Sequence, residues 1–62
     1  MSSIYNKFAA ARVEHLFFGT DGSYLAAARA QMTANPDYNE NKYHRAVEDS
    51  ERALSALRRW LP

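Results

Sequence analysis

The residues best suited to chemistry surround His44. Glu40 and Glu48 stand four positions to either side of it, so a helix would place all three side chains along one side. Imidazole nitrogens and carboxylate oxygens both bind divalent metals, and another chain could supply further ligands. The spacing differs, however, from the Glu-x-x-His pattern of di-iron bundles, and a solvated polar strip is the simpler interpretation. We therefore predict no bound metal and no other cofactor.

Other candidate catalytic groups do not form an arrangement that could carry a reaction. Glu14 and His15 are adjacent, and adjacent residues point about 100° apart on a helix, so they cannot act as a pair. Ser23, Ser50 and Ser55 lack the glycine-rich elbow that exposes a nucleophilic serine. A small helical chain also offers no obvious enclosed pocket. We expect a protein that is not an enzyme.

A run of polar side chains between residues 39 and 45 suits a different role. Amide and basic groups contact base edges and phosphates when they lie at the start of a recognition helix. The residues concerned are Asn39, Asn41, Lys42, His44 and Arg45. The chain nevertheless carries eight basic and seven acidic residues, so it lacks the positive charge typical of nucleic-acid binding. We keep a small DNA-binding transcriptional regulator as an alternative, but nucleic acid is not the partner we expect.

The size of the chain limits what its core can supply. With 62 residues, one hydrophobic core offsets the entropy of folding only marginally. The sequence contains no cysteine, which excludes disulfides and thiolate metal sites. Because proteins of this size commonly add disulfides, a metal or a partner subunit, we expect a homo-oligomer.

Apolar residues are too scattered for a membrane protein. No apolar run approaches the ~18 residues that a spanning helix needs. The first residues, MSSIYNKF, also lack the charged-then-apolar order of a signal peptide. We therefore expect a cytoplasmic protein with no membrane contact.

Hydrophobic periodicity predicts an all-α fold, with helices over residues 3–18, 23–34 and 36–61 in one small domain spanning 1–62. Ser2 or Ser3 can cap the first helix, and Gly19 is suited to end it. The core face predicted for that helix comprises Tyr5, Phe8, Ala9, Val13, Leu16 and Phe17, with Ile4, Ala11, His15 and Phe18 on a flank. The GTDGS segment favours a turn, with Thr20, Asp21 or Ser23 as the next cap. A β-hairpin over residues 14–27 remains an alternative.

The third helix is the longest and the most amphipathic. Asn35 is suited to cap it and Pro36 to begin it, while a capping box of Asp37 and Glu40 gives an alternative start. Apolar or small residues then repeat at alternating spacings of four and three, which is typical of a coiled coil or helical bundle. This seam comprises Tyr43, Val47, Ser50, Leu54, Leu57 and Leu61.

The seam and the aromatic pair before Gly19 provide more apolar surface than a short helical hairpin would cover. Tryptophan and arginine are enriched at binding hot spots, and Trp60 follows Arg58 and Arg59. The predicted protein interface comprises Phe17, Phe18, Val47, Leu54, Leu57, Trp60 and Leu61. We therefore expect a small protein-interaction module, a regulator, adaptor or inhibitor that also self-associates. A structural assembly subunit is a further alternative.

Overall fold

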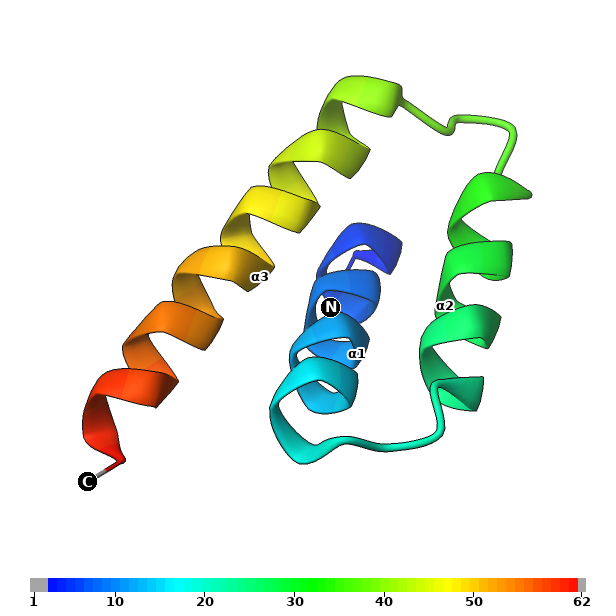
Figure 1. Ribbon diagram of the computed structural model, residues 1–62. Helices are drawn as coiled ribbons and strands as arrows, with labels where there is room; N and C mark the ends of the chain where they lie inside the picture. Colours follow the sequence, from blue (N-terminus) through cyan, green and yellow to red (C-terminus); the bar gives the residue numbers. More distant parts are fainter. Residues whose placement is uncertain (1–2, 62) are drawn as a thin grey trace.

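The computed structural model describes residues 3–61, which form three α-helices (Figure 1). The helices are α1 (Ile4–Phe18), α2 (Ser23–Thr33) and α3 (Glu40–Trp60). The all-α prediction is confirmed. Residues 3–61 contain no strand, so the alternative of a β-hairpin over residues 14–27 is wrong.

Helix α1 lies between the other two helices. It packs against both α2 and α3, whereas α2 and α3 do not approach each other closely along their backbones. The Lys7 ammonium on α1 donates a hydrogen bond to the Gln31 side chain near the end of α2, over 3.1 Å, so these two helices run antiparallel. The molecule is elongated, with dimensions of 43 × 23 × 20 Å.

Helices α1 and α3 run parallel, because later positions on one contact later positions on the other. The rings of Phe8 and Tyr43 lie 5.6 Å apart between their centres. Arg12 lies one turn after Phe8 on α1 and contacts α3 about two turns after Tyr43, where its guanidinium donates to the Ser50 hydroxyl over 3.0 Å. The C-terminal ends of α1 and α3 are therefore at the same end of the molecule, at the bottom of the view in Figure 1.

Both ends of α1 carry the caps that the sequence predicts. The Ser3 hydroxyl oxygen accepts a hydrogen bond from the Asn6 backbone N–H over 3.1 Å. Gly19 has a φ of +70°, a left-handed conformation that costs glycine little, and its N–H donates to the His15 carbonyl over 3.0 Å.

The connection between α1 and α2 differs from the prediction in its cap. Gly22 is the N-cap residue, with a φ of +84° and no side chain to offer, so Thr20, Asp21 and Ser23 do not occupy that position. Asp21 instead accepts hydrogen bonds from the Ser23 backbone N–H at 3.0 Å and hydroxyl at 2.8 Å. These bonds lower the pKa of Asp21, because they favour its charged form. His15 Nδ1–H donates to the Thr20 carbonyl over 2.8 Å and holds the loop against α1.

The predicted start of α3 at Pro36 is wrong, since the helix begins at Glu40. The reason is local competition for the backbone. The Asn35 side chain accepts from the Asp37 N–H over 2.8 Å, which forms a turn rather than a helix cap.

Asn39 is the N-cap of α3, and a distant residue reinforces its position. Its side-chain oxygen accepts from the Lys42 N–H over 3.2 Å. The Tyr5 hydroxyl on α1 accepts from the Asn39 backbone N–H over 2.8 Å. The predicted capping box of Asp37 and Glu40 is therefore also absent.

The core is small and draws on all three helices. Phe8, Met32 and Ala46 form its central cluster, one residue from each helix. The buried side chains also include Ala11, Ala28, Ser50 and Leu54.

The core face of α1 is displaced from the predicted one. Ala11, predicted on the flank, is buried, while Leu16, predicted in the core, is 44% exposed. Because α1 packs against two helices, the covered arc is wider than a single partner would make it, and it reaches the flank. Near its C-terminal end α1 loses that cover, which leaves Leu16 accessible.

Candidate protein-interaction surface

The seam of α3 divides into a covered part and an uncovered part. Ser50 and Leu54 are buried, and Tyr43 and Val47 are partly buried and packed against the core. The last two positions of the seam, Leu57 and Leu61, are exposed. The same apolar repeat therefore serves the core over its first turns and faces solvent over its last.

The one polar residue of the seam is fully paired. Ser50 is only 1% exposed, and its hydroxyl donates to the Val47 carbonyl over 2.7 Å. The same oxygen accepts from Arg12, whose guanidinium also forms an ion pair with Glu51 at 2.7 Å. A small hydrogen-bonded side chain therefore lets α1 cross α3 closely without an unsatisfied polar group.

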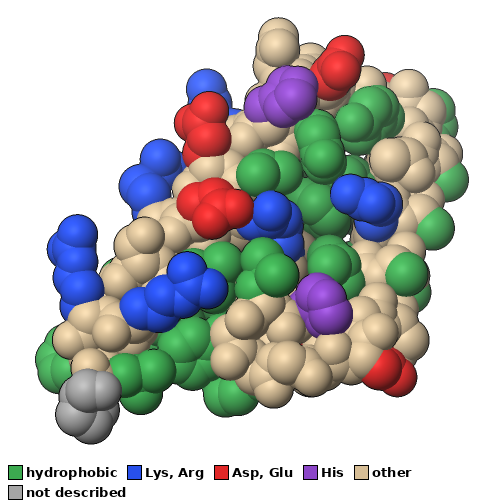
Figure 2. Space-filling model, viewed as in Figure 1, with side chains coloured by type: hydrophobic (Ala, Val, Ile, Leu, Met, Phe, Trp, Pro, Cys, Tyr) green, Lys and Arg blue, Asp and Glu red, His purple; other side chains and the backbone are tan. Residues whose placement is uncertain are grey.

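The exposed apolar side chains at the C-terminal end of α1 and α3 are termed the terminal patch. Its members are Leu16, Phe18, Leu57, Trp60 and Leu61. Trp60 is the most exposed at 86%, and Phe18 follows at 71%. Figure 2 shows hydrophobic side chains gathered along the lower left edge, from the end of α3 toward the end of α1. Exposed apolar groups gathered in this way are typical of interaction sites.

The structure separates the seven residues of the predicted interface. Phe18, Leu57, Trp60 and Leu61 belong to the terminal patch. Leu54 is 1% exposed and is therefore a core residue, not part of an accessible surface.

The other two residues of the predicted interface, Phe17 and Val47, are partly buried. The Phe17 ring meets that of Phe18 edge to face, 5.0 Å between centres, and so supports a member of the patch. Leu16 is the one patch residue that sequence reasoning missed, because its spacing places it on the same side as Phe8. Whether Leu16 is exposed depends only on how far along α1 the contact with α3 extends.

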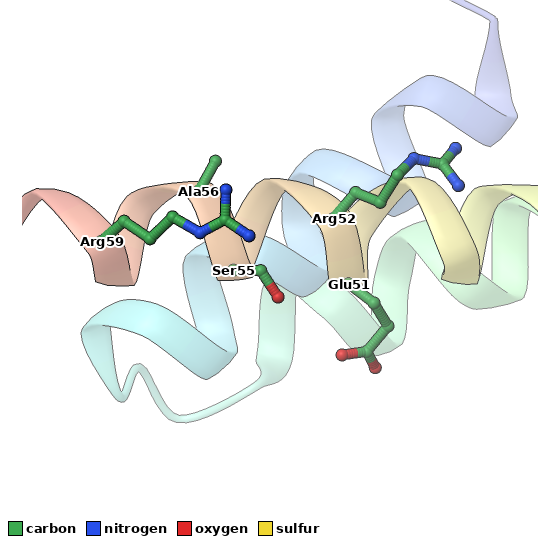
Figure 3. A pocket seen from close by; sticks show the side chains of 5 residues that line it. All are labelled: Glu51, Arg52, Ser55, Ala56 and Arg59. Atoms are coloured by element: carbon green, nitrogen blue, oxygen red, sulfur yellow. The ribbon is translucent and has the colours of Figure 1, made fainter.

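Charged groups border the patch on the outer side of α3. A shallow hollow of about 420 Å³ is lined by Glu51, Arg52, Ser55, Ala56 and Arg59. All five residues come from α3, and Figure 3 shows Glu51 pointing away from the two guanidinium groups. Arg52 forms an ion pair with Asp49. A surface formed by one helix cannot enclose a small ligand, so this hollow is an open, largely polar surface beside the terminal patch.

The polar N-terminal turns of α3 lie at the opposite end. His44 Nε2 is 3.9 Å from a Glu40 carboxylate oxygen, and both side chains are largely exposed. Over residues 3–61, no three histidine or acidic side chains come together where they could hold a metal.

The residues of the DNA-binding alternative share these turns, and two of them have structural roles. Asn39 caps α3 through its side chain. The Lys42 ammonium lies 5.8 Å from the centre of the Tyr5 ring, within range of a cation–π interaction. Asn41, His44 and Arg45 are exposed. DNA binding by this end of α3 stays a prediction.

None of the helices within residues 3–61 has the length and apolar character needed to cross a membrane. Comparisons of the chain with protein-family models, with curated proteins and with solved structures find no match.

Proposed function

We propose that this chain is a small protein-binding module, acting as a regulator, adaptor or inhibitor through the terminal patch. The exposure of Trp60 is the observation that carries the proposal. When a partner covers a tryptophan that was exposed to water, the burial of its apolar surface lowers the free energy of the complex.

The neighbourhood of Trp60 supports the same function. Leu57 lies one turn earlier on α3, Leu61 is the C-cap residue that follows Trp60, and Arg58 and Arg59 precede it directly. Hot spots of protein interfaces combine an aromatic anchor with arginine and a polar rim that excludes water. The terminal patch together with the neighbouring Arg58 and Arg59 has this composition.

A capture experiment with three baits tests the proposal. The wild-type chain, Trp60→Ser and Tyr24→Ser would each be immobilised and exposed to an extract of cells that express the chain. Tyr24 is an exposed aromatic residue on α2, 47% accessible, and it serves as the matched control. We expect wild type and Tyr24→Ser to retain a protein that Trp60→Ser loses.

The proposal is contradicted if the three baits retain the same proteins in the same amounts. Circular dichroism of each bait at the capture temperature shows whether helix content is equal. A folded Trp60→Ser variant with unchanged capture would exclude the terminal patch as a binding surface.

A further inference from the structure

A hollow of about 250 Å³ lies at the end of the molecule opposite the terminal patch, between the first turn of α1 and the first half of α3. Tyr5 and Asn6 line it from α1, and Lys42, Arg45 and Asp49 line it from α3. Drug-sized ligands occupy pockets of about 300–1,000 Å³, so a hollow of this size suits a smaller group. Because two helices form its sides, a ligand in it can be contacted from more than one direction.

The hollow contains two positive charges without ionic partners. Among the residues that the structure describes, neither Lys42 nor Arg45 forms an ion pair. Glu48 and Asp49 lie three and four positions after Arg45 on the same helix, within reach of its side chain. Asp49, the one acidic residue of the lining, instead forms its ion pair with Arg52. The charges of Lys42 and Arg45 are therefore left for a ligand.

Further hydrogen-bond donors come from the α1 side. The Lys42 ammonium lies 5.8 Å from the centre of the Tyr5 ring, which places the charge between the two helices. The Tyr5 hydroxyl oxygen accepts from the Asn39 backbone N–H over 2.8 Å, so its own hydrogen can still be donated. The Asn6 side chain adds an amide to the lining. A net positive charge with donors on two sides suits an anion that has several acceptor oxygens.

The hollow on the other side of α1 lacks this combination. It lies between α1 and α2 and measures about 500 Å³. Its one cationic residue, Lys7, already donates a hydrogen bond to the Gln31 side chain over 3.1 Å. An anion would have to displace that bond, whereas Lys42 and Arg45 have none to lose.

We propose that the hollow between the starts of α1 and α3 binds the phosphate group of a small ligand through Lys42 and Arg45. A guanidinium group matches two phosphate oxygens at once, and an ammonium group adds a compact point charge. Duplex nucleic acid suits the site less, because its binding relies on many phosphate contacts and the chain has a net charge of only +1. The site is separate from the terminal patch, so the proposal goes beyond the protein-binding function.

Titration with inorganic phosphate and with glycerol phosphate tests the site, followed by the backbone amide signals in NMR spectra at constant ionic strength. We expect saturable shifts at residues 5–6 and 42–46, and smaller ones with acetate, which has only two oxygens to bind. Shifts that do not saturate, or that acetate reproduces at the same concentration, overturn the proposal.

Three variants separate the site from a general effect of charge. Arg45→Gln should weaken phosphate binding about tenfold, because it removes a charge-assisted contact. Asp49→Asn should strengthen binding about threefold, since it removes the acid from the lining. Arg59→Gln, an exposed arginine in the last turn of α3, is the matched control and should change little. Equal weakening by Arg45→Gln and Arg59→Gln overturns the site.

A titration with a short DNA duplex separates the two sources of phosphate. No binding of the duplex, together with saturable binding of glycerol phosphate, supports a small ligand. A duplex that binds more tightly than glycerol phosphate and depends on Arg45 would assign the site to a nucleic-acid backbone and overturn the small ligand. Capture of a protein through Trp60 should be the same for wild type and Arg45→Gln, because the two surfaces lie at opposite ends.

Discussion

The two ends of the α3 seam differ in how much of their apolar surface is buried. From Tyr43 to Leu54 the seam packs against α1, and its polar member, Ser50, is buried with both of its hydrogen-bonding roles satisfied. Cover falls off after Leu54: Leu57 is 37% exposed, and Leu61, the C-cap residue beyond the helix, is 58% exposed. Periodicity therefore specifies which side of a helix is apolar, while the length of the neighbouring helix decides how much of that side is core.

The largest effect is expected when one leucine is replaced in the buried part of the seam and one in its exposed part. Leu54→Ala should lower the free energy of unfolding by about 2–5 kcal/mol, because it leaves a cavity in the core. Leu57→Ala should cost about 1 kcal/mol, since its side chain is already partly exposed. Urea denaturation measures both, at concentrations where the midpoint no longer depends on protein concentration. Equal losses would show that the two parts do not differ.

A second test concerns the N-terminal cap of α3, where the buried part of the seam begins. Asn39→Ala removes the side-chain cap of α3 and should cost about 0.5–2 kcal/mol in the free energy of unfolding. Asn41→Ala, two positions into the helix, changes an exposed side chain and should stay within about 0.5 kcal/mol. Thermal unfolding of the two variants compares them directly. A neutral Asn39→Ala would mean that the Tyr5 hydroxyl alone holds this terminus.

Two serines give a smaller and closely matched comparison. Ser50→Ala deletes the buried hydroxyl between Val47 and Arg12 and should cost about 0.5–1 kcal/mol. Ser55→Ala, on the exposed outer side, should be neutral or slightly stabilising, because alanine favours helix. Chemical denaturation of the pair measures the difference. The idea that Ser50 belongs to the core fails if both serines behave alike.

The smallest effect on stability is expected outside α3, at Asp21. It serves as a reference for the effects of the α3 variants. The hydrogen bonds from Ser23 lower the pKa of Asp21 in the folded chain below its ordinary value of 3.8. Its charged form therefore stabilises the fold above the unfolded pKa, and that contribution disappears as the pH falls through the folded pKa. Asp21→Asn should be slightly less stable than wild type at neutral pH, and the two should converge in acid. A gap that widens in acid would contradict this assignment.

Local sequence signals placed α1 well because its ends depend on nearby residues, whereas for α2 they gave the bounds but not the N-cap, which is Gly22. Ser3 and Gly19 fulfil their predicted roles through hydrogen bonds within four residues of themselves. Asn35 and Asn39 carry equivalent local signals for the start of α3. The Tyr5 hydroxyl, 34 residues away, supports Asn39, and no local pattern contains that contact.

The terminal patch could be predicted in part. Trp60, Leu61, Leu57 and Phe18 were all identified from their type and position near the ends of helices. Leu16 and Leu54 were exchanged between surface and core. Their assignment depends on where α1 and α3 overlap, which follows from the parallel arrangement of those helices and not from either pattern alone.

The central place of α1 also has a consequence for the order of folding. Helix α2 follows α1 through a short loop, so the antiparallel pair closes a smaller loop than the pairing of α1 with α3 and can form first. Helix α3 then finds one side of α1 already occupied and the other free. The docking of α3 closes the longest loop and therefore carries the largest entropic cost of loop closure. We expect this step to set the folding rate.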